Sequence, residues 1–200
     1  DGSILVFETN DIERITKEPS VAVKPDSGKR KEHRRAGWVV GFSGGPGAGN
    51  FPNESSKIGA IGNFRVGRMV HPKLLIHIES QVYVREEIIS NVKVETNFGN
   101  STIAGTLYPG DPTQPSGGFY LRGGIGAANG DFNGSILGTK FQLQYRGWGV
   151  LVGLGYEFRL ARRFALGVGA GYNKMFFEPE LSTNLDVQFS QFVLDFSWYL

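Results

Sequence analysis

The stretch "GWGVLVGLGYEFRLARRFALGVGAGYNKMFF", residues 147–177, restricts the fold of this chain more than any other feature. An apolar residue stands at every even position from Trp148 to Leu160 and from Phe164 to Tyr172, and glycine occupies many odd positions. A period of two residues is that of a β-strand with two different faces. One face is apolar, and the other is small with a few charges. The pattern predicts strands whose apolar face meets lipid and whose small face meets a narrow, crowded lumen.

Composition agrees with one all-β domain and excludes several other classes. A chain of 200 residues suits an undivided barrel, and no apolar run reaches the 18 or more residues of a transmembrane helix. Glycine contributes 29 residues, spread along the expected strands rather than gathered in one tract. The formal net charge of +2 gives no case for nucleic acid. Without cysteine, the chain has no disulfide framework or thiolate metal site.

The alternation recurs from Gly37 onward and predicts eight antiparallel strands. Short or Pro-rich turns should follow the second, fourth and sixth strands, whereas longer polar loops are expected at 44–57, 86–100, 129–140 and 177–183. This arrangement, with an even strand number, is typical of an up-and-down transmembrane β-barrel of the outer-membrane type. The expected strands are 38–42, 58–70, 74–85, one ending at Tyr108, 119–127, 141–160, 164–176 and 184–200.

Residues 1–35 differ from the rest, and the barrel is expected to take residues 36–200. The first part is predicted to be a short N-terminal periplasmic segment followed by a charged linker, "KRKEHRR". An even strand count returns the chain to the side where it began, so both ends should be periplasmic. The linker is either simply solvated or contacts anionic lipid headgroups or a neighbouring protein, since it ends immediately before the barrel.

Aromatic residues near the short-turn ends of the strands give a second membrane signal. A membrane interface favours a belt of such side chains, and a soluble barrel has no reason for one. The predicted belt comprises Trp38, Tyr108, Phe119, Phe158, Phe164 and Trp198.

Three stretches carry a resemblance to a known group: residues 147–172, "YPGDPTQPSGGFYLRGGIG" and the C-terminal "FVLDFSWYL". From about Gly37 onward the chain resembles the small eight-stranded outer-membrane β-barrel proteins of Gram-negative bacteria, the OmpA/OmpX-like and OmpW-like group. Its N-terminal segment resembles a small β-module that precedes such porin-family barrels in Bacteroidota. The last stretch is similar to the signal that the barrel-assembly machinery recognises, although the family usually ends in Phe. The signal residues are Phe192, Leu194, Phe196, Trp198 and Leu200.

The resemblance implies a location in the cell outer membrane. It also implies partners: outer-membrane lipid and lipopolysaccharide, the barrel-assembly machinery, and other outer-membrane or periplasmic proteins.

Charged residues at lumen-facing positions are expected to form an ion network. Arg65 and Glu79 oppose each other directly if their hairpin is centred on Pro72, and Arg122 and Glu157 are expected at similar heights. Such charges must pair, because desolvating a lone charge is costly. An eight-stranded interior is just wide enough to be filled by side chains, which predicts a plugged barrel. The predicted network is Arg65–Glu79 and Arg122–Glu157, with His77 nearby and Asp195 as a further acceptor.

The last strand shows a break in phase. Leu185, Val187 and Phe189 stand at odd positions, whereas the apolar residues from Phe192 onward stand at even ones. A β-bulge near Ser190–Gln191 would keep both sets toward lipid. The alternative is that the upper half of the strand lies outside the membrane, where its exterior face need not be apolar.

Three classes of function fit this pattern to different degrees. The first is a structural or interaction component, including a subunit of a larger membrane complex. The second is a small channel or transporter for hydrophobic compounds, as the OmpW-like resemblance suggests. A soluble lipocalin-like carrier is disfavoured because its lumen should be apolar. His77 and Glu79 share a strand face, but no serine is evidently placed beside them. The sequence predicts no catalytic, cofactor-binding or metal-binding residues.

Overall fold

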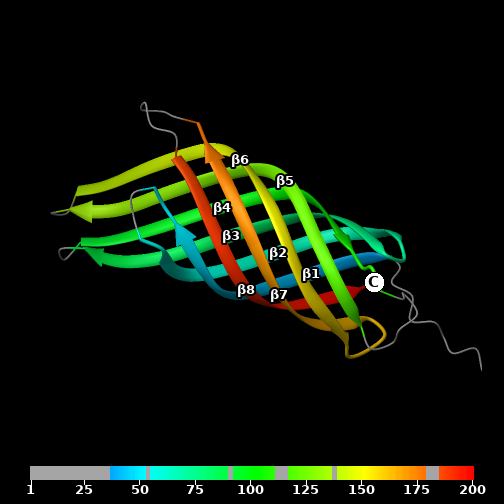
Figure 1. Ribbon diagram of the computed structural model, residues 1–200. Helices are drawn as coiled ribbons and strands as arrows, with labels where there is room; N and C mark the ends of the chain where they lie inside the picture. Colours follow the sequence, from blue (N-terminus) through cyan, green and yellow to red (C-terminus); the bar gives the residue numbers. More distant parts are fainter. Residues whose placement is uncertain (1–36, 53–54, 90–91, 111–116, 137–138, 179–184) are drawn as a thin grey trace, which may run out of the picture. The chain divides into compact units, whose positions relative to one another are not determined.

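Eight strands form one closed antiparallel barrel in sequence order, and β8 returns to pair with β1 (Figure 1). This computed structural model describes residues 37–52, 55–89, 92–110, 117–136, 139–178 and 185–200. The predicted all-β, eight-stranded, up-and-down barrel is confirmed, whereas the predicted N-terminal segment lies outside the described residues. Among the residues described, no helix is long and apolar enough to span a bilayer. The strands are β1 Trp38–Asn50, β2 Lys57–His71, β3 Leu74–Ile89, β4 Val92–Leu107, β5 Gly118–Ile136, β6 Thr139–Arg159, β7 Phe164–Phe177 and β8 Leu185–Tyr199.

The barrel begins and ends at the same end, where tight turns join β2 to β3 and β6 to β7. The Leu200 amide donates to the Trp38 carbonyl at 2.9 Å. Gly37 precedes β1 with a φ of 87°, and a Cβ there would lie 2.3 Å from the Leu200 carbonyl oxygen. Glycine therefore allows the two ends to meet so closely. We call this end of the barrel the short-turn end.

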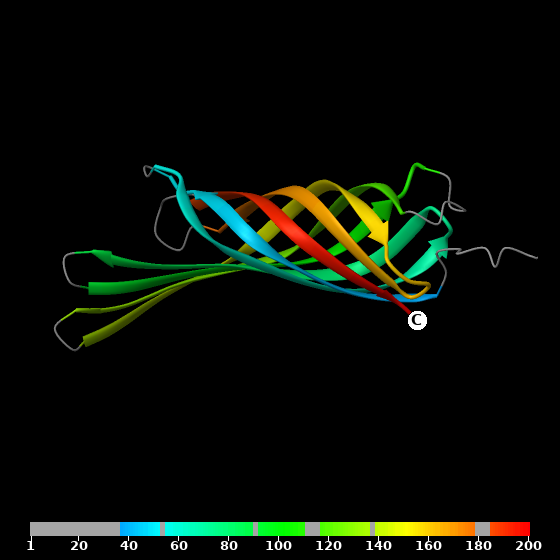
Figure 2. The same ribbon diagram turned by 90° about the horizontal axis from the view of Figure 1, so that it is seen from below.

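At the other end the strands reach farther than the sequence predicts. β1 continues through "SGGPGAGN" to Asn50, and β5 continues to Ile136, although loops were expected there. The reason is pairing on both sides: β1 is hydrogen-bonded to β2 and β8, so the ladder holds a segment of low strand propensity. Most of 86–100 and 129–140 is likewise strand rather than loop. The β3–β4 and β5–β6 hairpins project beyond the remaining strands (Figures 1 and 2).

The predicted β-bulge at Ser190–Gln191 is wrong. β8 pairs with β7 without interruption, with Ser190 opposite Tyr172 and Gln191 opposite Gly171. Phe189 therefore points into the lumen, where only 1% of it is exposed. It is held there by Tyr83, whose ring centroid lies 4.5 Å away. Val187 and Phe189 of upper β8 are core residues of the barrel and do not face lipid.

Glycines on the lumen side make room for large interior side chains. A Cβ on Gly155 would lie 2.5 Å from the Tyr120 hydroxyl and 2.5 Å from the Val168 carbonyl oxygen. A Cβ on Gly169 would lie 2.6 Å from the same hydroxyl. The Tyr120 ring thus lies against β6 and β7 at two positions that have no side chain. This explains glycine at positions 155 and 169.

We expect Gly155→Ala to lower the free energy of unfolding by about 1–3 kcal/mol, because the added methyl overpacks the lumen against Tyr120. Gly62→Ala is the matched control, since a Cβ there would have nothing within 4 Å. Urea unfolding of both variants in lipid vesicles, followed by tryptophan fluorescence, measures the difference. Equal stabilities would show that Tyr120 does not fill the space beside Gly155.

Candidate functional site

Four buried charged residues from four strands meet in the middle of the lumen. Asp195 on β8 accepts two hydrogen bonds of 2.7 Å from the Arg65 guanidinium on β2, a bidentate arrangement that is among the stronger polar contacts in proteins. The same carboxylate accepts a bond of 3.0 Å from Arg122 on β5. Arg122 also donates to Glu79 on β3 at 3.0 Å, and Arg65 donates to Ser197 at 2.6 Å. We call Arg65, Glu79, Arg122 and Asp195 the central charge cluster; its formal charges cancel.

The two predicted ion pairs are not the ones that form. Arg65 and Glu79 oppose each other across β2 and β3 as expected, but Arg65 extends across the narrow lumen to Asp195. Arg122 lies opposite Gly153, whereas Glu157 lies opposite Gly118, four residues farther along the ladder. At ~3.3 Å per residue this is a displacement of about 13 Å along the strands. Arg122 therefore pairs with Glu79 and Asp195 rather than with Glu157.

Glu157 lies in a separate layer nearer the short-turn end. The Tyr199 hydroxyl is 2.7 Å and 2.9 Å from its two carboxylate oxygens, and the Tyr108 hydroxyl donates to it at 3.3 Å. The Arg159 Nε lies 3.9 Å from the carboxylate, and its guanidinium stacks 4.2 Å from the centroid of the Tyr199 ring. Neither the two tyrosines nor Arg159 was predicted as a partner of Glu157. The signal that could have found them was their place in the lumen-facing phase of their strands.

Tyr108 was predicted in the aromatic belt, and this assignment is wrong. Only 2% of the residue is exposed, because it continues the lumen-facing phase of β4 and its hydroxyl reaches Glu157. The other proposed belt residues follow the exterior phase. The structure exposes Trp38, Phe119, Phe158 and Trp198 and leaves Phe164 partly exposed.

His77 lies beside the central charge cluster and is buried. Its Nε2 is 2.9 Å from the Thr106 hydroxyl, and its Nδ1 is 3.7 Å from the Glu79 carboxylate. The six ionisable residues proposed from the sequence, His77 among them, are therefore in the interior, although the partners of the charged ones differ from those expected. In the part of the chain that the structure describes, no group of three or more His, Cys, Asp or Glu side chains could hold a metal ion.

Amide side chains fill the next layer of the lumen. Gln81 donates to Gln191 at 2.7 Å across the barrel, and Asn100 donates to Asn173 at 3.3 Å.

An apolar cluster, which we call the apolar plug, fills the lumen toward the projecting hairpins. The sequence signal for the apolar plug was the break in phase of β8, where the apolar residues change from exterior to lumen-facing positions. Its buried members are Ile61, Tyr83, Phe98, Ala128, Met175, Phe177, Val187 and Phe189.

The exterior carries an apolar band of the height that a membrane requires. On β6 the band runs from Trp148, stacked on Phe176 at 4.3 Å, to Phe158. These eleven residues match the 9–11 residues of a transmembrane strand. The residues proposed as an assembly signal lie on this outer surface of β8 and at the chain end: Phe192, Leu194, Phe196, Trp198 and Leu200.

Comparisons with known proteins identify the fold but not a close relative. No family model matches the chain, and no curated protein matches its sequence. The crystal structure of Neisserial surface protein A (NspA) is similar, with a TM-score of 0.55 and 15% identity over 82% of this chain and 98% of that one. Ail, the attachment invasion locus protein of Yersinia pestis, has a TM-score of 0.54 and 11% identity over 82% of this chain and 99% of that one. With its closed sheet, its buried charges in the lumen and its apolar exterior, the chain has the fold of the small eight-stranded transmembrane β-barrels of the outer-membrane type.

Proposed function

We propose that this protein acts as a closed barrel, a structural or interaction component of the outer membrane rather than an enzyme or a conduit. The observation that carries the proposal is the occupied lumen. The tyrosine layer around Glu157, the central charge cluster, the amide layer and the apolar plug succeed one another along its height. A small channel for hydrophobic compounds would need a path past charges bonded across the barrel and past the apolar plug.

The projecting hairpins are the surface that we propose for interaction. Pairing between β2 and β3 ends at Val84, and pairing between β6 and β7 ends at Gly147. Beyond these residues, β3 and β6 continue with one edge unpaired by any strand in the described part of the chain. Such edges can accept an extended segment of another protein. The proposed partners remain outer-membrane or periplasmic proteins, the surrounding lipid and lipopolysaccharide, and the barrel-assembly machinery during insertion.

Conductance across a planar bilayer tests the closed lumen. We expect the wild-type protein to insert without steady single-channel currents, because cross-bonded side chains exclude an ion path. The double variant Phe98→Ala, Phe189→Ala removes two rings of the apolar plug, yet it should also stay closed because the central charge cluster lies below them. A steady, voltage-independent current from folded wild-type protein would reject the proposal and favour the channel.

A further inference from the structure

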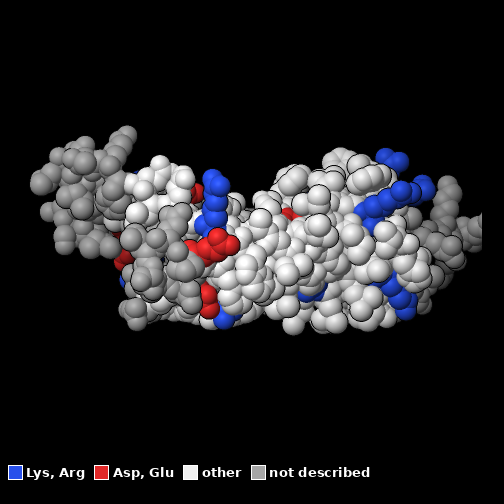
Figure 3. Space-filling view, turned by 90° about the horizontal axis from the view of Figure 1, so that it is seen from above, with Lys and Arg blue, Asp and Glu red and all other residues white. Residues whose placement is uncertain are grey.

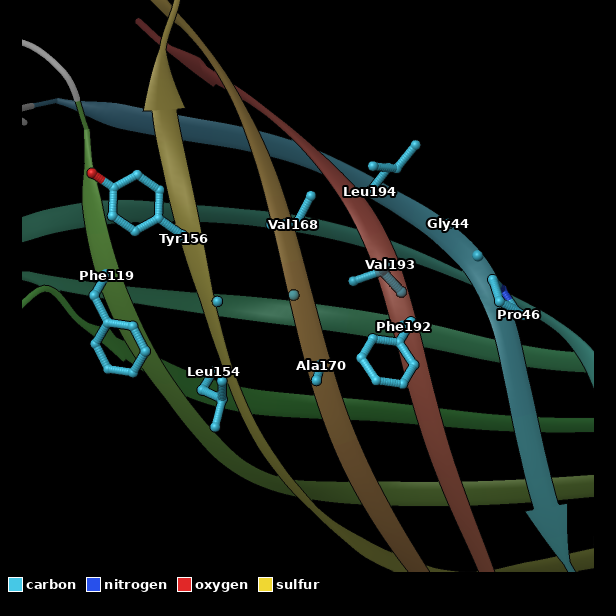
Figure 4. A pocket seen from close by; sticks show the side chains of 13 residues that line it. Gly44, Pro46, Phe119, Leu154, Tyr156, Val168, Ala170, Phe192, Val193 and Leu194 are labelled. Carbon is cyan, nitrogen blue, oxygen red and sulfur yellow. The ribbon is translucent and has the colours of Figure 1, made fainter.

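The barrel wall carries an apolar groove on its outer surface, with β7 as its floor. Val168 and Ala170 are the small floor residues, because their neighbours across the ladder are larger: Tyr156 and Leu154 on β6, and Leu194 and Phe192 on β8. The groove has a volume of about 570 Å³ and opens to the outside (Figure 4). It lies inside the apolar band, so its surroundings are hydrocarbon rather than water. We call it the β7 groove.

The floor strand starts at a basic turn. Arg162 and Arg163 are exposed in the connection between β6 and β7, and the Arg163 carbonyl accepts a hydrogen bond of 2.8 Å from the Tyr199 amide. The distance along β7 from Arg163 to Val168 is about 16 Å at ~3.3 Å per residue. Because barrel strands tilt by about 35–45°, this path descends about 12–13 Å, which stays within the ~15 Å of one leaflet of a ~30 Å hydrocarbon core.

The exposed charges near this end are all basic within the described residues. Besides the two arginines of the β6–β7 turn, Arg68 is exposed and Lys73 is partly exposed on the β2–β3 hairpin. The acidic residues near this height, Glu157 and Asp195, are buried in the lumen. On the face shown in Figure 3, the charged side chains at this end are blue, whereas red ones lie toward the other end together with further blue ones.

We propose that the β7 groove and its basic turn form a binding site for one anionic phospholipid. The phosphate would lie at Arg162 and Arg163, and an acyl chain would follow β7 into the groove between Tyr156 and Leu194. Two observations select this ligand. The basic turn complements the charge of a phosphate, and the apolar groove lies within the depth of one leaflet. A protein segment would not need two cations at the level of the headgroups.

Tryptophan quenching by brominated lipids tests the site directly. Trp198 lies opposite Phe164, the first residue of β7, and the chain has only two other tryptophans. Trp38→Phe with Trp148→Phe therefore leaves one reporter beside the turn. In phosphatidylcholine vesicles, phosphatidylglycerol brominated near the glycerol backbone should bind about fivefold or more tightly than brominated phosphatidylcholine, since each basic residue near the headgroups favours an anionic lipid by about that factor.

Two pairs of variants in the single-tryptophan protein separate this site from general attraction. Arg162→Gln with Arg163→Gln should remove the preference, whereas Arg68→Gln with Lys73→Gln, which removes the same charge from the hairpin four strands away, should leave it. Ala170→Phe fills the groove and should weaken binding of the anionic lipid. Ala127→Phe makes the same change at an exposed exterior position of β5 and should have no effect.

Heat-modified migration on gels shows which variants are folded, and Val168→Phe replaces Ala170→Phe if the latter does not fold. The proposal is overturned if phosphatidylglycerol shows no preference in the parent protein. It is also overturned if both charge variants reduce the preference equally, or if filling the groove changes nothing.

Discussion

Asp195→Ala is expected to lower the free energy of unfolding of the barrel by about 3–5 kcal/mol, the usual cost of removing one partner from a buried ionic group. Asp195 is the acceptor shared by Arg65 and Arg122, at 2.7 Å and 3.0 Å. Without its carboxylate, Glu79 alone would balance two buried guanidinium groups. The loss should exceed that of an ordinary hydrogen bond, because the stranded charges keep their desolvation cost.

Urea unfolding in lipid vesicles measures this loss, and Asp186→Ala is the matched control on the same strand. Asp186 pairs with Lys174 at 3.4 Å, but both side chains are partly exposed. Its removal should cost less than about 1 kcal/mol, as is usual for exposed pairs. A loss below 1 kcal/mol for Asp195→Ala as well would mean that the central charge cluster contributes little to stability.

Val152→Arg is expected to cost about 2–4 kcal/mol, because it places a cation on the lipid face near the middle of the bilayer. Val152 is 55% exposed and lies between Trp148 and Phe158 on β6. Folding yield and unfolding free energy in vesicles of defined thickness give the result. A thinner bilayer should reduce the penalty, since the arginine then reaches the headgroups more easily.

Leu143→Arg on the same strand is the control. Leu143 is 50% exposed, nearly as much as Val152, but it lies on the projecting part of β6 beyond the last residue paired with β7. There its surroundings are water, so the change should be close to neutral. Equal losses at the two positions would show that the membrane boundary does not lie near Trp148.

Alternation, together with the turn lengths and a hairpin centred on Pro72, was enough to assign strand order, the β2–β3 register and the facing of the six ionisable lumen residues. It was enough because the pleat has a strict period of two and a slip of one residue would reverse every side chain. The partners of those charges could not be derived in the same way. An arginine is long enough to cross a narrow lumen, so Arg65 is not limited to its neighbour Glu79 and instead reaches Asp195 on β8.

Two further errors, at Tyr108 and Phe189, share one physical origin. Tyr108 was assigned to the membrane interface by its type and height, but its phase on β4 directs it inward to Glu157. Phe189 was assigned to lipid because it is apolar, although the end of an eight-stranded lumen can be an apolar core. Residue type alone does not distinguish these environments. Counting the two-residue alternation along the strand from a residue of known facing would have assigned both residues correctly.

The contact between Arg65 and Asp195 joins residues 130 positions apart in the sequence, and it has a consequence for biogenesis. β8 carries Asp195 and is also the strand that closes the barrel against β1. An open sheet inserted in a bilayer would expose both arginines of the cluster and an unpaired strand edge to hydrocarbon, and each is unfavourable there. Insertion and closure are therefore coupled, and a partly inserted intermediate would be driven back to the aqueous phase until its last strand is in place.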